Sequence, residues 1–332
     1  MRRNPAVLSF SSFAARTLGL IAFLTSLSLQ ATPLQYPLKP IRWICPYPPG
    51  SSADVIGRIF STPFSHSVSQ QVIVDNRPGA SGNLAAEMVA KASPDGYTLL
   101  LLNTPIVSSQ FLFPGLRFDP RKDFEPIAML GLTAYLLVVN PQVPAKTVQE
   151  LVSLAKSQPG QLNYASTGTG GGLHLAMELF QMLTATRLLH VPYKGSSSTV
   201  PDLISGRIDT LFGSAPSLLP HWRSGRIRTL GISLLQRSPT LPQIPTLSES
   251  GIPNFEAITF VALAAPKGVD RAIVKTVNHW IEKIALSDDT VQSLQHQSTE
   301  LLILTPEKTA AFIAKESIKW QKVIVTAGIK AE

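Results

Sequence analysis

The sequence predicts an α/β fold built from mainly parallel sheets with helices on both faces. Short apolar runs alternate along the chain with segments of helical period, and turn residues separate them. This alternation is typical of parallel sheets that helices cover on both sides. Hydrophobic residues make up 44% of the 332 residues and charged residues 15%, which is enough core for two domains of ordinary size.

The individual elements follow from the same alternation. Each expected strand is a run of aliphatic residues that ends at glycine, proline or small polar residues, and each expected helix repeats apolar residues every three to four positions. We expect strands at residues 41–46, 72–75, 98–102, 162–166, 188–192, 208–212 and 227–232. We expect helices at residues 53–68, 83–92, 147–157, 171–184, 197–205, 270–286 and 306–326. The last helix has Thr305 as its N-cap, Pro306 in its first turn and Gly328 beyond its end.

Two longer apolar stretches, Ile127 to Asn140 and Phe255 to Ala265, predict the domain organisation. Each is long enough to run from one domain into another. A chain that leaves a first domain, builds a second and returns needs two such crossings. We therefore expect a discontinuous first lobe of residues 32–130 plus 256–332, a second lobe of residues 131–255, and two crossing strands as the hinge.

The first 31 residues have the features of a signal peptide. They contain three arginines and no acidic residue, so they are positively charged. Leu18 to Leu29 is an apolar stretch that is too short to span a membrane as a regular helix. We expect cleavage near Ala31 and export to the periplasm. The alternative is an uncleaved anchor or a disordered tail.

Charge and motif content exclude several classes of function. The net charge of +8 is scattered along the chain, so no stripe of basic and aromatic residues indicates a nucleic-acid partner. Neither G-x-x-x-x-G-K-[ST] nor G-x-G-x-x-G is present, and we expect no cofactor. His174 and His190 have no acidic residue or cysteine at a plausible ligand spacing, so we expect no metal. Cys45 is the only cysteine, which rules out an intramolecular disulfide.

The first candidate binding site is the turn after strand 41–46. The apolar run breaks at a Pro-Pro-Gly sequence, and Ser51 and Asp54 are spaced as an N-cap and an acidic third helical residue. The N–H groups at a helix N-terminus attract anions, so this turn is suited to a small anion, most simply a carboxylate. The alternative is a well-capped helix that binds nothing. The expected binding residues are Tyr47, Pro49, Gly50, Ser51, Ser52 and Asp54.

The second candidate is the glycine-rich turn after strand 162–166. A helix begins there, and serine and threonine hydroxyls add donors beside the backbone N–H groups. For the histidine of this segment, as for His190, a structural role in the interior is the alternative. The expected binding residues are Ser166, Thr167, Gly168, Thr169, Gly170 and His174.

Other strand ends extend the candidate site. Strands 98–102 and 188–192 are each followed by polar residues, and strand 208–212 begins with an acid. The alternatives are a solvated surface charge for Lys194, and for Asp209 the ordering of a neighbouring loop or the repulsion of unsuitable ligands. The residues expected at the cleft between the lobes are Asn103, Thr104, Tyr193, Lys194 and Asp209.

Ordered sequence blocks resemble the Bug (TctC-like) family of extracytoplasmic solute-binding proteins, which serve tripartite tricarboxylate transporters. The resemblance extends from Tyr36 nearly to the C-terminus, with one departure at Ser51, where the family has a glycine. It implies a two-lobed periplasmic-binding-protein type II fold that holds carboxylates between the two turns, partly through ordered water. The blocks include YPLKPIRWICPYPPGSSAD, VIVDNRPGASGN, AKASPDGYTLL, FDPRKDFEPIAML, LNYASTGTGGGLHLAMELF, HVPYKG and DLISGRID.

The resemblance and the two turns together indicate a periplasmic solute-binding protein that is not an enzyme. We expect a monomer that binds a small organic anion, namely a di- or tricarboxylate, an acidic amino acid or an aromatic carboxylate. It would deliver this anion to the membrane permease subunits of a tripartite tricarboxylate transporter. The alternatives are a ligand sensor for a signalling partner and a secreted hydrolase, although the chain has no G-x-S-x-G elbow.

Overall fold

The structure, a computed structural model, describes residues 36–193 and 198–330. The predicted signal peptide and Lys194 therefore lie outside the described residues. Pro37–Glu332 make up one compact unit, and the description below concerns that unit. Within the described ranges, no helix is both long and apolar enough to cross a membrane.

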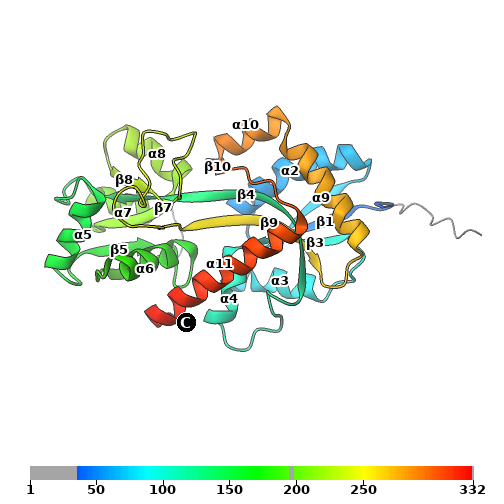
Figure 1. Ribbon diagram of the computed structural model, residues 1–332, viewed down its shortest axis with the longest axis horizontal. Coiled ribbons are helices and arrows are strands. Elements are labelled where there is room, and N and C mark those ends of the chain that lie inside the picture. The colour runs from blue at the N-terminus through cyan, green and yellow to red at the C-terminus, as the bar shows by residue number, and fades with distance from the viewer. Residues whose placement is uncertain (1–35, 194–197, 331–332) are drawn as a thin grey trace, which may run out of the picture. The chain divides into compact units, whose positions relative to one another are not determined.

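Strands and helices alternate along most of the chain (Figure 1). The strands are β1 (Ile41–Cys45), β2 (Val72–Asn76), β3 (Thr98–Asn103), β4 (Phe124–Val139), β5 (Asn163–Ser166), β6 (Leu189–Pro192), β7 (Thr210–Ser214), β8 (Arg228–Ile232), β9 (Ile258–Pro266) and β10 (Thr299–Glu300). The helices are α2 (Ser52–Val68), the 3-10 turn η1 (Ala80–Gly82), α3 (Asn83–Ala90), α4 (Thr104–Leu112), α5 (Val148–Ser157), α6 (Gly172–Thr184), α7 (Thr199–Ser205), α8 (Ala215–Arg223), α9 (Arg271–Ala285), α10 (Asp288–His296) and α11 (Pro306–Ala327).

The strands pair in the order β2-β1-β3-β9-β4-β7-β5-β6, and β8 and β10 also pair with β4. The first sheet contains β1, β2, β3, β9, β10 and the beginning of β4, and the second contains the end of β4 with β5 to β8. Pairs among β1 to β3 and among β5 to β7 are parallel, whereas the described pairs that involve β4 or β9 are antiparallel. The α/β fold is confirmed, but the sheets are mixed, because the two long strands oppose their neighbours.

β4 passes from the first sheet to the second between Ala134 and Tyr135. Ala134 pairs with Ile258 of β9, whereas Tyr135 pairs with Ser214 of β7. The two long apolar stretches of the sequence are thus β4 and β9, which Figure 1 shows side by side in the middle of the fold. This change of sheet within one strand brings the ends of both sheets together.

The C-terminal helix α11 packs on the cores of both sheets. Ile313, near its beginning, belongs to the core of the first sheet with Phe260. Trp320, about two helical turns further on, is fully buried in the core of the second sheet with Phe180 and Phe212. Figure 1 shows α11 lying across β4 and β9. Burial of side chains of this size stabilises a fold by about 1.5–3 kcal/mol each.

Three helices, α4, α8 and α10, are absent from the sequence prediction. α4 is buried on several sides, at Ile106, Val107, Ser109 and Leu112, so it has no polar face that would reveal a helical period. α8 contains two prolines, and in a sequence prolines usually indicate that a helix ends. One of them, however, lies in the first turn of α8, where proline is tolerated. Burial therefore hid α4, and the position of its prolines hid α8.

Candidate functional site

A cavity of about 230 Å³ lies where β4 changes sheet. Tyr135 of β4 and Thr259 of β9 contribute to its lining, together with residues from both sheets and their helices. Eight of the described lining side chains carry hydroxyl groups, and none carries a formal charge. Apolar side chains such as Leu173 and Leu218 complete the lining. The volume is below the ~300 Å³ at which drug-sized pockets begin, so the cavity suits a small metabolite.

Three helices of nine or more residues begin at this cavity, and the short helix α7 also begins there, at Thr199. Ser52 is the first residue of α2, Leu173 the second of α6 and Ser217 the third of α8, and all three line the cavity. The first N–H groups of a helix have no acceptor within that helix, and its N-terminus carries a partial positive charge. Among the described residues, no side chain caps α6 or α8. The three helix N-termini therefore make a favourable site for an anion, although no cationic side chain takes part.

Asp54 stabilises the turn between β1 and α2 through hydrogen bonds on the side away from the cavity. Its carboxylate accepts hydrogen bonds from the Gly50 N–H at 2.9 Å, from Arg58 Nε at 3.0 Å and from Asn76 Nδ2 at 2.9 Å. Burial opposes its ionisation, but these bonds outweigh burial and lower the pKa of Asp54. Asn76 also donates to the carbonyl of Tyr47 at 2.9 Å. The carboxylate therefore orders the turn, and it does not line the cavity.

Within the same turn, the structure separates the other predicted residues. Ser52 lines the cavity, while Ser51 is the N-cap of α2 and accepts from the Asp54 N–H at 3.4 Å. Pro49 and Gly50 are exposed and lie outside the cavity lining. Only Ser52 of this predicted group thus contributes directly to the cavity.

The side chains of Asn103 and Thr104 make hydrogen bonds in the interior of the first sheet and do not line the cavity. Asn103 caps α4 by accepting from the Ile106 N–H at 3.3 Å, and the Tyr47 hydroxyl lies 3.5 Å from the same oxygen. The Thr104 hydroxyl is fully buried and accepts from the Phe260 N–H on β9 at 3.3 Å. These side chains face inward because α4 begins immediately after β3, which the sequence did not indicate.

The glycine loop, residues 167–171, presents Thr167 to the cavity. Gly168 and Gly170 have φ values of +132° and +75°, which favour glycine. The Gly170 N–H donates to His174 Nδ1 at 2.9 Å, so it points away from the cavity and toward the interior. Thr169 is half-buried and lies outside the cavity lining. The loop thus contributes one predicted residue directly, and its glycines determine the loop's shape.

The two histidines of this region stack in the interior. Their ring centroids are 3.9 Å apart, and Tyr164 stacks on His190 at 4.9 Å. Burial, together with His174, lowers the pKa of His190 to about 4. Ser166, which is only 1% exposed, lies 2.7 Å from His190 Nε2. These contacts match the structural role that the sequence left open for both histidines. The described residues contain no group of three or more side chains suited to a metal ion.

Tyr193 and Asp209 also lie outside the cavity lining. The Tyr193 hydroxyl donates to Asp202 at 2.7 Å, and burial together with this bond raises the pKa of Tyr193 to about 12. Asp209 accepts from the Asn163 N–H at 2.8 Å, at the amino ends of β5 and β7. The cavity is at the other end of these strands, so Asp209 orders a neighbouring loop, which was the alternative interpretation.

Sequence reasoning missed several lining residues. Thr133, Tyr135 and Thr259 lie on strands that read as apolar, where a threonine or tyrosine carries no signal of its own. Ser214 and Ser217 did have a signal, because Ser-Ala-Pro follows an expected strand in the same way as the other two turns. A third strand–turn–helix unit was therefore readable at this position.

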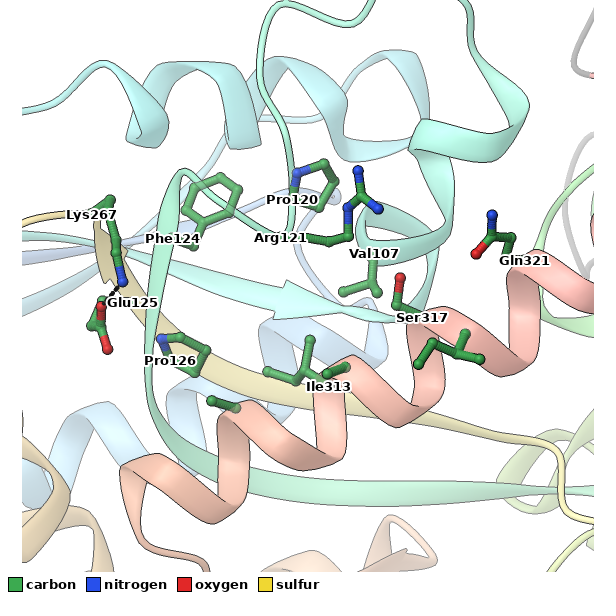
Figure 2. A pocket seen from close by; sticks show the side chains of 13 residues that line it. Val107, Pro120, Arg121, Phe124, Glu125, Pro126, Lys267, Ile313, Ser317 and Gln321 are labelled. Carbon is green, nitrogen blue, oxygen red and sulfur yellow. Dashed lines mark hydrogen bonds and ion pairs between the residues drawn. The ribbon is translucent and has the colours of Figure 1, made fainter.

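A larger hollow of about 390 Å³ lies elsewhere, between α4, α11 and the beginning of β4 (Figure 2). Its base is apolar, and its two cations already have acidic partners: Lys267 lies 2.5 Å from Glu125, and Arg121 lies 3.2 Å from Asp119. No helix begins in it, and none of the predicted binding residues lines it. The smaller cavity is therefore the better candidate: although the hollow has the larger volume, only the smaller cavity has lining groups suited to an anionic ligand.

The chain is similar to several known proteins. The family described as "Tripartite tricarboxylate transporter family receptor" matches residues 56–329. Protein BugT of Bordetella pertussis is 36% identical over 297 residues, which are 89% of this chain and 91% of BugT. A solved R. palustris protein with adipate has a TM-score of 0.78 and 30% identity, with 90% of this chain and 100% of that chain covered. MatC from Rhodopseudomonas palustris with bound malate has a TM-score of 0.74 and 27% identity, with 87% and 100% covered.

Proposed function

The chain belongs to the tripartite tricarboxylate transporter receptor family, and from that premise we propose that its cavity captures a small organic carboxylate. The family consists of binding receptors, so the prediction of a solute-binding protein that is not an enzyme is confirmed. The observation that carries the proposal is the convergence of the α2, α6 and α8 N-termini on one hydroxyl-lined cavity. The structural relatives with adipate and malate support a carboxylate as the ligand class.

The absence of a formal charge among the described lining residues shapes the proposed chemistry. Helix N-termini and hydroxyl groups would donate to the carboxylate oxygens, as they do in other anion sites. The apolar side chains Leu173 and Leu218 would contact the carbon skeleton. A dicarboxylate, an acidic amino acid and an aromatic carboxylate all combine these two features, so the screen below includes each of them.

We further propose that the two sheets with their helices act as lobes, residues 32–130 plus 256–332 and residues 131–255. Ligand that contacts both lobes would favour the closed arrangement by its differential affinity for that state. The closed form would dock on the membrane permease subunits of a tripartite tricarboxylate transporter. The N-terminal leader predicted from the sequence would export the chain to the periplasm, in line with a 34% identical relative solved as a periplasmic transporter.

A thermal-shift screen tests the proposed ligand class. The purified protein is heated with malate, adipate, glutamate, benzoate, a neutral sugar and a cationic amino acid. A ligand at ~100 times its Kd stabilises the folded protein by about 2.7 kcal/mol, which raises Tm by several degrees. We expect a shift with at least one carboxylate and none with the sugar or the cation.

Two variants show which cavity responds. Ser217→Trp places a large side chain in the proposed site, and Ala314→Trp does the same in the hollow of Figure 2; both positions are exposed and helical. The carboxylate shift should disappear in Ser217→Trp and persist in Ala314→Trp. The reverse pattern would move the site to the hollow, and a shift with only neutral or cationic solutes would overturn the anion argument.

A further inference from the structure

We propose that His174 is a positioning residue for ligand capture, whose Nδ1 atom keeps the glycine loop in its binding shape by accepting the hydrogen bond of the Gly170 N–H. This inference rests on the proposed function, since the loop presents Thr167 to the ligand cavity. It assigns to His174 a role through the loop, whereas the sequence alone had suggested direct contact with the ligand.

The hydrogen bond to Gly170 carries the argument. His174 is 5% exposed, and its Nδ1 accepts from the Gly170 N–H at 2.9 Å. A ring nitrogen that accepts a hydrogen bond carries no proton, and a protonated imidazole donates from both nitrogens. A second proton on the ring and the hydrogen bond to Gly170 are therefore mutually exclusive.

The neighbouring histidine, His190, supports a second glycine of the loop, Gly168, through Ser166. The Gly168 N–H donates to Ser166 Oγ at 3.2 Å, and this hydroxyl lies 2.7 Å from His190 Nε2. Burial lowers the pKa of His190 to about 4, so this second support is neutral while an ordinary histidine titrates. The stacked pair thus supports two glycines of the loop, Gly170 through His174 and Gly168 through Ser166 and His190.

Groups on three elements face His174. On its own helix, Glu178 Oε1 lies 3.6 Å from Nε2, and burial opposes the ionisation of Glu178, although hydrogen bonds from His174 and Tyr164 lower its pKa overall. Tyr164 on β5 and His190 on β6 lie against the ring. The carboxylate of Glu178 favours the tautomer of His174 that carries its proton on Nε2, which leaves Nδ1 free to accept from the Gly170 N–H.

The position of the loop connects this hydrogen bond to ligand binding. A Cβ on Gly170 would lie 2.7 Å from Leu112 Cδ1, so Gly170 is packed closely against α4. If His174 released the Gly170 N–H, that donor would lose its partner in a buried place and the loop would have to rearrange. Thr167 begins this loop and α6 begins directly after it, so both would move with the loop and the cavity would lose its shape.

Hydrogen exchange at the Gly170 amide tests the inference without any ligand. The full protein is compared with His174→Gln, whose amide oxygen can still accept, with His174→Phe, which cannot, and with His279→Gln as an exposed control. After correction for the intrinsic exchange rate, we expect protection of this amide to be about tenfold lower in His174→Phe than in the unaltered protein and in His279→Gln. His174→Gln should keep most of the protection.

Affinity for adipate and malate is then measured with the same proteins. We expect weakening of about tenfold in His174→Phe but not in His174→Gln. Full protection of the Gly170 amide in His174→Phe, or equal losses in His174→Phe and His174→Gln, would overturn the inference. Because the exchange measurement needs no ligand, failure to bind any carboxylate would count against the proposed function alone.

Discussion

The hydroxyl of Tyr135 lies against Gly172, so closely that a Cβ on Gly172 would collide with it. Tyr135 is the first residue of β4 that pairs in the second sheet, and Gly172 is the first residue of α6. The contact between Tyr135 and Gly172 therefore joins the point where β4 changes sheet to the N-terminus of α6. Space, rather than an unusual φ, requires glycine at this position.

Gly172→Ala should disturb this contact and the cavity with it. We expect a loss of about 1–3 kcal/mol in the free energy of unfolding, because an added methyl group must displace a buried tyrosine. Denaturant unfolding measures this loss. Tyr135→Phe removes the opposing oxygen, so the double variant should recover part of the stability. Equal losses in the single and double variants would show that the hydroxyl is not what excludes a side chain.

Ser214→Asp should place a fixed negative charge at the uncapped N-terminus of α8. We expect a gain of about 0.3–1 kcal/mol in stability from the helix dipole, together with loss of the carboxylate-induced thermal shift. Ser224→Asp, at the C-cap of the same helix, is the matched control and should instead destabilise the protein. A variant Ser214→Asp that still responds fully to carboxylates would contradict the placement of the anion at α8.

Asp54→Asn should weaken the first turn at neutral pH. The hydrogen bonds that lower the pKa of Asp54 stabilise the fold where the carboxylate is ionised, and this stabilisation is lost as pH falls through the lowered pKa. We expect a cost of about 1–3 kcal/mol at pH ~7, which diminishes below pH ~4. Urea unfolding across this pH range measures the difference, and a cost that does not depend on pH would argue against an ionised Asp54.

Glu316→Gln should have the opposite dependence on pH. Glu316 is 1% exposed on α11, and burial raises its pKa although Lys319 lies 2.6 Å away. A raised pKa means that the unaltered protein loses stability as pH rises through the folded value, whereas glutamine resembles the protonated acid. We expect the variant to gain relative to the unaltered protein between about pH 4 and about pH 8. A relative loss over this range in urea unfolding would contradict the assignment.

Much of the fold was predictable because local signals agreed with the tertiary structure. The helix from Thr305 begins and ends where its capping residues indicate, and the apolar stretches at residues 127–140 and 255–265 are the two long strands. The sheets were predicted to be mainly parallel, but the antiparallel pairs of β4 and β9 were not foreseen, because the direction of these strands depends on how the chain leaves and re-enters the first sheet. Strand direction is a property of the chain topology, and a short segment of sequence does not determine it.

The site was predictable in its segments and less so in its side chains. Both predicted turns reach the cavity, through Ser52 and Thr167. Asp54 was expected to face the ligand, but it faces inward because Asn76, distant in sequence, brings a donor to its carboxylate. Tyr135 could not be identified at all, since its position at the change of sheet appears only in three dimensions.

Calorimetric titration of the purified protein and of Ser217→Trp with adipate and with malate tests the central claim most directly. The account predicts saturable binding of one carboxylate per chain for the unaltered protein, and loss of that binding in Ser217→Trp, whose side chain would occupy the cavity where α2, α6 and α8 begin. Unaltered binding by Ser217→Trp would contradict the account, since the carboxylate would then be held elsewhere on the protein.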